Sequence, residues 1–316
     1  MDEQRRRPVR KKKLRKGRIF ITALIFLLIA AGIYMYAQFK AGESLAGNDM
    51  DMTEMEFTAD DFDNKIENFL LIGVDSRGES QSRSDTMMLL SLNHETNNMK
   101  LVSFMRDIYA DIPEYGYNKL NSAYYFGEVN LLKQTLNNMF DVPIHHYAVI
   151  DFTSFESLID VLAPNGVDIY VEKDMSEKIY VELTQGQHRL NGKELLGYAR
   201  FRADSEGDFG RVDRQQQVIE ALKEEFIKPS NLKNMPKFVG ALEGYIQTDL
   251  SKTDQLKTGL SAITTGDMTI DRITIPAEGT YSFGRSAHAG SIIEIDVEEN
   301  KRILHEFLDS EQDGLQ

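Results

Sequence analysis

Residues 19–37 form an uncharged, apolar run of 19 residues, and this run constrains the chain more than any other feature. Folded as a helix it would be about 28 Å long, close to the roughly 30 Å hydrocarbon core of a bilayer. Ten Lys or Arg residues precede it and only Lys40 follows closely, so the positive-inside rule puts the N-terminus in the cytoplasm. We expect a single-pass protein of the cell membrane, with a cytoplasmic basic tail (residues 1–18), a transmembrane helix (19–37) and an extracellular remainder.

Two other interpretations of this N-terminal segment are open. The apolar run could be a cleaved signal peptide, because Ser44-Leu45-Ala46 is an acceptable small-x-small site. It is, however, longer than the about 7–15 apolar residues usual for a signal peptide. The basic tail could bind DNA, but a basic tail next to a spanning helix is more typical of a topology signal that contacts anionic membrane lipid.

The charge of the chain is strongly asymmetric. Beyond residue 18 there are 26 basic and 48 acidic residues, so this part carries a net charge of −22. A surface of this sign repels nucleic acid, and we expect no nucleic-acid partner. Cysteine is absent from the chain, which excludes disulfides, thiol catalysis and zinc–thiolate sites.

The stretch over residues 69–106 has the pattern of a functional site. Three short apolar runs, residues 69–74, 87–92 and 99–105, predict buried strands separated by turn-like segments. Asp75 ends the first run and Asp85 precedes the second, so a hairpin brings both carboxylates to its open loop. If the third run continues the sheet as a meander, Arg106 returns to the same edge.

The rest of the chain predicts an α/β fold with a mixed central sheet flanked by helices. Residues 38–65, acidic and without periodicity, predict an extracellular stalk. We expect a catalytic domain over residues 66–228, including helices at 128–140, 153–162, 191–199 and 211–228 and strands at 146–150 and 166–171. The part over residues 229–316, with helices near 235–245 and 253–263, completes or extends the same domain, and we find no candidate site residue there.

Arginine is unevenly distributed. Seven of the eleven arginines beyond the membrane segment fall in two regions: Arg77, Arg83, Arg106, Arg200, Arg202, Arg211 and Arg214. Arginine suits paired contacts to phosphate or carboxylate oxygens, and the last two occupy the first turn of a predicted helix, where free N–H groups favour anions. The cluster predicts a polyphosphate site, although any single arginine could instead pair with a surface acid.

Asp75 and Asp85 are the candidate metal ligands. Two carboxylates, with phosphate oxygens and water completing the shell, are a usual way to hold Mg²⁺ on a diphosphate. The alternative is that both aspartates cap turns through backbone amides. The adjacent His145 and His146 would point in opposite directions on a strand and do not predict a metal pair. The chain has no G-x-S-x-G, H-E-x-x-H, P-loop or G-x-G-x-x-G motif.

At these residues the sequence resembles the LytR-CpsA-Psr family of membrane-anchored extracytoplasmic phosphotransferases of Gram-positive cell envelopes. The resemblance covers roughly residues 68–226 and rests on NFLLIGVDSR, RSDTMML, LVSFMRDIYADIP, KLNSAY, GQHRLNGKELLGYARFR and GDFGRVDRQQQ, in that order. One departure is LVSFMRD, where Phe104-Met105 stands in place of the family's frequent Ile-Pro. Arg106 and Asp107 are retained, so only the local backbone is affected.

The resemblance implies an enzyme that attaches an anionic glycopolymer from a polyprenyl diphosphate carrier to peptidoglycan, with wall teichoic acid the first choice and capsular polysaccharide the second. It implies Asp75 and Asp85 as catalytic residues and ligands of Mg²⁺ or Mn²⁺, with Arg106 also catalytic and all seven arginines binding the diphosphate. The lipid tail would lie in an apolar pocket. Further motif positions are Lys119, Asn121, Asp208 and Gln215.

Two other functions are open. One is a non-catalytic, membrane-tethered regulator or receptor that binds an anionic lipid or wall polymer and signals through the basic tail. Retention of both aspartates favours catalysis, because a phosphate receptor needs only the arginines. The other is a pyrophosphatase activity at the same site, with water as the acceptor.

Overall fold

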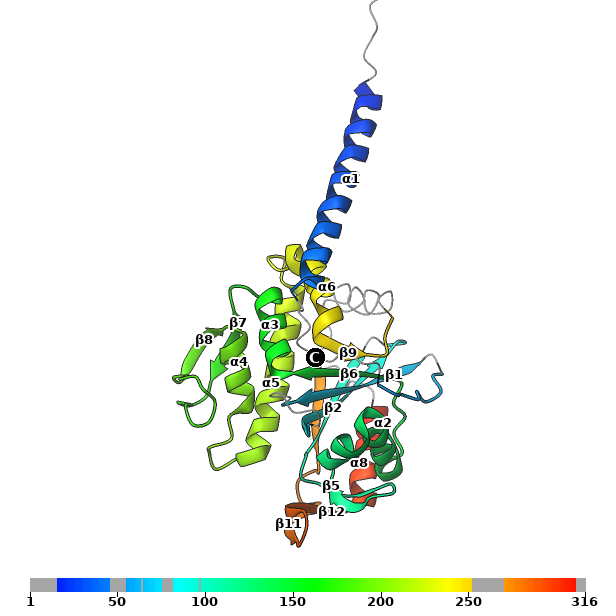
Figure 1. Cartoon of the computed structure of the whole chain (residues 1–316), viewed down its shortest axis with the longest axis vertical. Coiled ribbons are helices and arrows are strands. Elements are labelled where there is room, and N and C mark those ends of the chain that lie inside the picture. The colour runs from blue at the N-terminus through cyan, green and yellow to red at the C-terminus, as the bar shows by residue number, and fades with distance from the viewer. Residues whose placement is uncertain are drawn as a thin grey trace, which may run out of the picture.

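The computed structural model describes residues 16–45, 55–63, 65–75, 82–96, 98–251 and 270–310, without the side chains of residues 16–23 and Leu232. Arg77, the basic tail up to residue 15, the whole of the expected helix at 253–263, and residues 46–54 and 64 of the expected stalk lie outside this description. Figure 1 shows a long N-terminal helix leading into an α/β body built around one central sheet.

The sheet has six strands in the order β10-β3-β2-β1-β6-β9. Their bounds are β1 Ile66–Val74, β2 Ser84–Asn93, β3 Asn98–Phe104, β6 His146–Asp151, β9 Ile246–Thr248 and β10 Ile270–Ile275. Strands β1, β2 and β3 pair antiparallel, which confirms the predicted meander, whereas β6 and β10 run parallel to β1 and β3. The predicted fold class, a mixed sheet flanked by helices, is therefore confirmed.

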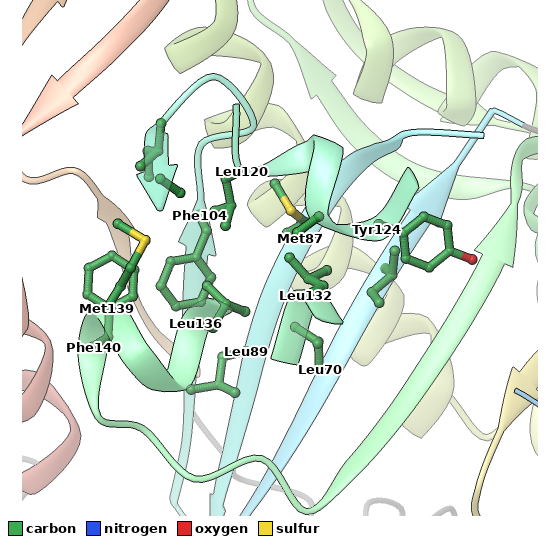
Figure 2. Close-up of a cluster of buried hydrophobic side chains, with 14 of the residues drawn as sticks. Leu70, Met87, Leu89, Phe104, Leu120, Tyr124, Leu132, Leu136, Met139 and Phe140 are labelled. Carbon is green, nitrogen blue, oxygen red and sulfur yellow. The ribbon is translucent and has the colours of Figure 1, made fainter. Parts of the chain in front are cut away.

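One face of the sheet packs against two helices, α2 (Asn121–Phe140) and α8 (Val297–Asp309). Figure 2 shows Leu70 and Leu89 of the sheet meeting Leu132 and Leu136 of α2, and all four side chains are fully buried. Helix α2 starts seven residues before the predicted helix and is kinked at Gly127, because the KLNSAY segment forms its first turns.

The other face of the sheet is covered by helices α3 (Phe152–Leu162), α5 (Gly207–Ile227) and α6 (Met235–Tyr245), with α4 (Gly192–Arg200) packed on α3 and α5. A hairpin of β7 (Val167–Val171) and β8 (Gly186–Leu190) lies beside α4 and α5. Two more hairpins, β4 (Tyr109–Ile112) with β5 (Gly116–Lys119) and β11 (Tyr281–Ser286) with β12 (Gly290–Ile295), lie at the opposite end of the molecule from α1.

Helix α1 (Lys16–Glu43) contains the only segment of the described residues that is long and apolar enough to cross a membrane, Leu24–Glu43. Its apolar side chains are exposed in the chain itself, as expected for a helix surrounded by lipid. The end of α1 packs tightly on α6. A Cβ on Gly240 would lie 2.0 Å from the carbonyl oxygen of Phe39, so only glycine permits this approach.

The expected stalk is not a free spacer over its whole length. Helix α1 continues to Glu43, and Met55 and Phe57 pack against the core of the domain. Asp60 accepts a hydrogen bond from the amide of Ile144 at 2.7 Å, which fixes this segment to the strand region. The structure therefore places the folded domain directly against the end of α1.

Candidate active site

A β-bulge brings the two aspartates to one place. In the β1–β2 ladder Gly73 pairs with Thr86 while Val74 pairs with Ser84, so Asp85 is an extra residue on β2. A bulge breaks the alternation of side chains, and Asp75 and Asp85 both line the same cavity as a result. Gly73 is needed here because an added Cβ would lie 3.0 Å from the Cβ of Thr86.

The cavity has a volume of about 790 Å³ and lies between the sheet and helices α3, α5 and α6. Most of its wall is apolar: sheet residues such as Leu71 and Leu90 face side chains such as Leu158 and Phe238. At one end the wall becomes charged, with Asp75, Asp85, Arg106, Arg200, Arg202, Arg211 and Gln215.

Arg106 is held among carboxylates at this charged end. Its Nη1 donates to Asp85 Oδ1 at 2.7 Å and its Nε donates to Asp208 Oδ2 at 3.0 Å. Burial alone would lower the pKa of Arg106, but the charges of Asp208 and Asp85 and the hydrogen bond to Asp85 together raise it. Asp107 pairs with Lys119 at 2.7 Å and lies 3.8 Å from Arg106. The guanidinium of Arg106 is thus fixed in place and permanently charged.

Arg211 is buried with less compensation. It is 5% exposed, and its closest ion-pair contact among the described residues is Asp208, 3.5 Å from Nη2, a carboxylate that already serves Arg106. Its Nε is buried without a hydrogen-bond partner in the described chain. Burial and the positive charge of Arg106 lower the pKa of Arg211, an effect that Asp208 only partly offsets. Such a group gains most from a bound anion.

Arg200 at the end of α4 and Arg202 in the loop that follows also line the charged end of the cavity. Arg200 is the last residue of α4, lies 4.3 Å above the ring of Phe152 and is 3.7 Å from Asp75 Oδ2. Arg202 is half exposed and 3.9 Å from Asp208. The end therefore contains four guanidinium groups (Arg106, Arg200, Arg202, Arg211) and three carboxylates (Asp75, Asp85, Asp208), a surplus of one positive charge.

Arg214 lies elsewhere, although the sequence grouped it with the other arginines. It is 1% exposed and donates to Glu172 Oε1 at 2.7 Å and to the carbonyl oxygen of Phe201 at 3.0 Å, and it pairs with Asp204 at 3.1 Å. Arg211 and Arg214 are three residues apart on α5 (Gly207–Ile227), so their side chains leave the helix only about 60° apart. Arg211 nevertheless lines the cavity, whereas Arg214 lines a separate pocket together with Glu172 and Glu206. Arg214 fixes the loop that carries Arg202, and it does not line the cavity.

The remaining predicted positions are also placed outside the cavity wall, apart from Gln215. Arg83 is exposed and lies 5.8 Å from the ring centroid of Tyr125. Asn121 is buried, and its backbone N–H donates to the backbone carbonyl oxygen of Arg106 at 3.2 Å, so it helps to position Arg106 through the backbone. Lys119 acts on Asp107, as described above. Arg77 lies outside the described residues.

The carboxylates of Asp75 and Asp85 could bind a cation that prefers oxygen ligands, but only if a bound substrate supplies further oxygen atoms. Asp75 and Asp85 supply carboxylate oxygens, as Mg²⁺ requires. Within the described residues no group of three or more His, Cys, Asp or Glu side chains gathers that could hold a metal by itself. The remaining coordination positions would have to come from phosphate oxygens and water.

Sequence reasoning missed part of the site. Phe238, Leu242 and Ile246 line the apolar end of the cavity, although no candidate site residue was expected over residues 229–316. In the sequence these three residues recur every four positions, which indicates an apolar face of a helix but does not distinguish a cavity wall from a packed core. Asp208 was assigned no role, and the structure shows it bridging Arg106, Arg202 and Arg211.

Fold and site together define a class: an α/β domain on an N-terminal apolar helix, with an apolar cavity that ends in a cluster of arginines and aspartates. The family model LytR_cpsA_psr matches residues 32–303, so this chain belongs to the LytR-CpsA-Psr family, which confirms the resemblance seen in the sequence.

Relatives and solved structures agree with this assignment. The chain is 46% identical over 249 residues to the regulatory protein MsrR of Staphylococcus aureus, covering 79% of this chain and 76% of that protein. It is 40% identical over 201 residues to the polyisoprenyl-teichoic acid–peptidoglycan teichoic acid transferase TagU of Oceanobacillus iheyensis, covering 61% and 62%. The crystal structure of B. subtilis TagV matches with a TM-score of 0.66 at 27% identity, covering 79% of this chain and 100% of that one. TagT bound to LI-WTA matches with a TM-score of 0.63 at 26% identity, covering 83% and 99%.

Proposed function

We propose that this protein is a membrane-anchored extracytoplasmic phosphotransferase. It transfers an anionic glycopolymer, wall teichoic acid before capsular polysaccharide, from a polyprenyl diphosphate carrier to peptidoglycan. The observation that carries the proposal is the junction of a large apolar cavity with Arg211, a buried cation that shares its nearest described carboxylate with Arg106. A polyprenyl diphosphate has the matching form, an apolar tail joined to a double anion.

The arrangement of charges supports phosphoryl transfer. An acceptor sugar hydroxyl attacks the glycan-side phosphorus, the bond from this phosphorus to the bridging oxygen breaks, and polyprenyl phosphate leaves with the electron pair. Negative charge grows on the leaving phosphate, and preorganised guanidinium groups stabilise it without reorganisation. Arg106 is already oriented by two carboxylates, so the protein needs little movement to meet this charge.

Asp75 and Asp85 would hold Mg²⁺ (or Mn²⁺), which would supply neutralisation of the phosphate charge. Asp85 is the side chain we assign to accept the proton of the attacking hydroxyl. Water in place of the sugar would give the pyrophosphatase side reaction.

The anchor gives the enzyme access to its donor. With the basic tail in the cytoplasm, the ectodomain lies outside the cell beside the leaflet that carries the lipid diphosphate. Helix α6 both packs on α1 and lines the apolar cavity, so the lipid end of the cavity lies next to the membrane helix. The acidic ectodomain is unsuited to nucleic acid.

The test is transfer by the full-length protein in lipid nanodiscs. The donor is a polyprenyl diphosphate-linked teichoic acid precursor, the acceptor is a soluble peptidoglycan oligomer, and Mg²⁺ is present. We expect a phosphodiester-linked product that is reduced at least about a hundredfold by Asp85→Asn or Arg106→Gln, as for loss of one preorganised electrostatic contact. Arg272→Gln, which alters an exposed arginine paired with Glu220, is the control. Undiminished product with both site variants would exclude this assignment.

A second function is favoured by one observation, the name of the regulatory protein MsrR at 46% identity. A receptor would bind the lipid-linked polymer without converting it. It would therefore retain donor binding in Asp85→Asn and give no phosphodiester product with the wild-type protein.

A further inference from the structure

Three aromatic rings form a continuous line from the anion-binding cluster to the surface. Phe209 directly follows Asp208, and its ring stacks on that of Tyr281 with centroids 5.1 Å apart and planes at 27°. Tyr281 in turn meets Phe283 edge to face, at 5.6 Å and 80°. Phe283 is 73% exposed, so the outer ring of the line presents its surface to solvent.

The hairpin that carries the outer two rings is fixed to the active site. The amide of Ile293 in β12 donates to the carbonyl oxygen of Asp107 at 2.8 Å, and Ile293 also forms a bridge with Ile108. Asp107 directly follows Arg106. The hairpin β11–β12 therefore has a set position relative to the arginines, at the end of the molecule opposite to α1 (Figure 1).

An exposed ring held rigidly beside a phosphotransferase site is suited to carbohydrate. The C–H face of a pyranose ring is apolar and stacks on an aromatic face, while its hydroxyl groups remain in water. Arg285 lies two residues beyond Phe283 and so on the same face of β11, and it is exposed. Within the described part of the chain no carboxylate forms an ion pair with it.

We propose that the face of β11 formed by Tyr281, Phe283 and Arg285 binds the peptidoglycan acceptor. The aromatic rings stack on the amino-sugar rings of the glycan strand, and Arg285 pairs with a carboxylate of its stem peptide. This inference rests on the proposed function, because it names where the acceptor of that transfer is held.

Two observations favour the acceptor over the donor polymer. The donor's lipid occupies the cavity on the side of α6 and α1, so the hairpin is on the side from which a wall-bound strand approaches. The hairpin region also carries three exposed acids, Glu278, Glu294 and Asp296, against the single cation Arg285. A polyphosphate chain would be repelled there, whereas a mostly uncharged amino-sugar chain with sparse carboxylates is accommodated.

The experiment measures binding of a soluble peptidoglycan tetrasaccharide with its stem peptides to the full-length protein in nanodiscs, in the absence of donor. We expect Phe283→Ala to raise the dissociation constant about three- to tenfold, as for loss of one stacking contact. The matched control is Tyr170→Ala, since Tyr170 on β7 is 58% exposed and remote from the hairpin. Arg285→Gln should weaken the tetrasaccharide but leave unchanged the binding of an N-acetylglucosamine tetramer, which has no carboxylate.

The outcomes separate this inference from the proposed function. Transfer in the wild-type protein with tetrasaccharide affinity unchanged in Phe283→Ala would overturn the acceptor site and leave the transferase intact. Loss of affinity in Phe283→Ala, with Asp85→Asn still binding the tetrasaccharide, supports the acceptor site by a readout that needs no turnover. Dependence on Phe283 for a soluble teichoic acid fragment but not for the tetrasaccharide would assign the face to the donor and overturn the inference.

Discussion

Two buried arginines on the same helix should respond oppositely to the same substitution. Arg211 and Arg214 are three residues apart on α5 and are 5% and 1% exposed. Arg214 is matched by Glu172 and Asp204, at 2.7 and 3.1 Å. Burial and the positive charge of Arg106 lower the pKa of Arg211, and the nearest described carboxylate, Asp208, is shared between the two arginines. Arg214 is therefore a structural cation, whereas Arg211 is the cation that we propose binds the ligand.

The magnitudes follow from this difference. Replacing a poorly compensated buried cation by an apolar side chain of similar length stabilises a fold by about 1–3 kcal/mol, so Arg211→Met should raise the free energy of unfolding. Breaking a matched buried pair costs about 3–5 kcal/mol, so Arg214→Met should lower it. For the ligand, one unit charge at about 4 Å with an effective dielectric constant of about 20 contributes about 4 kcal/mol. Arg211→Met should thus weaken diphosphate binding by two to three orders of magnitude, in round figures.

Two measurements on the detergent-solubilised full chain check this. Thermal unfolding gives the sign of each stability change, at about 2–4 °C per kcal/mol for a domain of this size. Calorimetric titration with farnesyl diphosphate gives the affinity. Two outcomes would contradict the assignment of Arg211 to ligand binding. One is that Arg211→Met destabilises the protein as Arg214→Met does, and the other is that Arg211→Met leaves the affinity for farnesyl diphosphate unchanged.

Three further predictions concern other parts of the molecule. His146 has its pKa raised from 6.5 to about 9, first by a hydrogen bond with Asp249, so its stabilisation is complete below pH 6.5 and lost as pH rises to about 9. His146→Gln should cost about 1–2 kcal/mol at pH 6, after allowance for solvent screening, and almost nothing at pH 9.5, as measured by unfolding at both pH values. Lys100, whose pKa burial lowers, donates to the last carbonyl groups of α8, and Lys100→Met should cost about 2–3 kcal/mol in the same assay because these carbonyls lose their partner. The leucine side chain in Gly240→Leu would collide with the carbonyl oxygen of Phe39 and should separate α6 from α1. Transfer from a membrane-embedded donor should then fall, while hydrolysis of a short soluble diphosphate persists. Equal loss of both activities would contradict a role for the α1–α6 contact in access to the membrane donor.

The sheet could be predicted from the sequence because its information is local. The three apolar runs of the meander are adjacent in the chain and are separated by turn-like segments, so their pairing followed without knowledge of any distant contact. The position of Arg106 beside Asp85 followed from that pairing alone. The family motifs then brought in the second group of arginines, about a hundred residues away.

The parts that failed depend on distant or subtle geometry. Arg211 and Arg214 look equivalent in the sequence, and it is the distant acids Glu172 and Asp204 that hold Arg214 away from the cavity. The bulge at Asp85 adds one residue to a ladder, which no periodicity reveals. The apolar residues of α6 that line the cavity have the same composition as core residues, so the sequence cannot distinguish a packed face from a face left open for lipid.

The sheet itself explains how one short stretch can serve both stability and binding. The side chains on one face of β1 and β2, such as Leu70 and Leu89, are fully buried against α2. The side chains on the other face, such as Leu71 and Leu90, line the cavity. A sheet apolar on both faces normally requires helices packed closely on both. Here the helices on the second face leave about 790 Å³ unfilled, so apolar area that packing would have removed from water is still available. A lipid chain that fills this space gains about 25 cal/mol per Å² of that area, and the strands that line the space end at the aspartates. In the proposed function, lipid binding and placement of the diphosphate therefore follow from the same strand geometry, and a substitution such as Leu90→Ser should weaken the binding of a long polyprenyl diphosphate more than that of a short one.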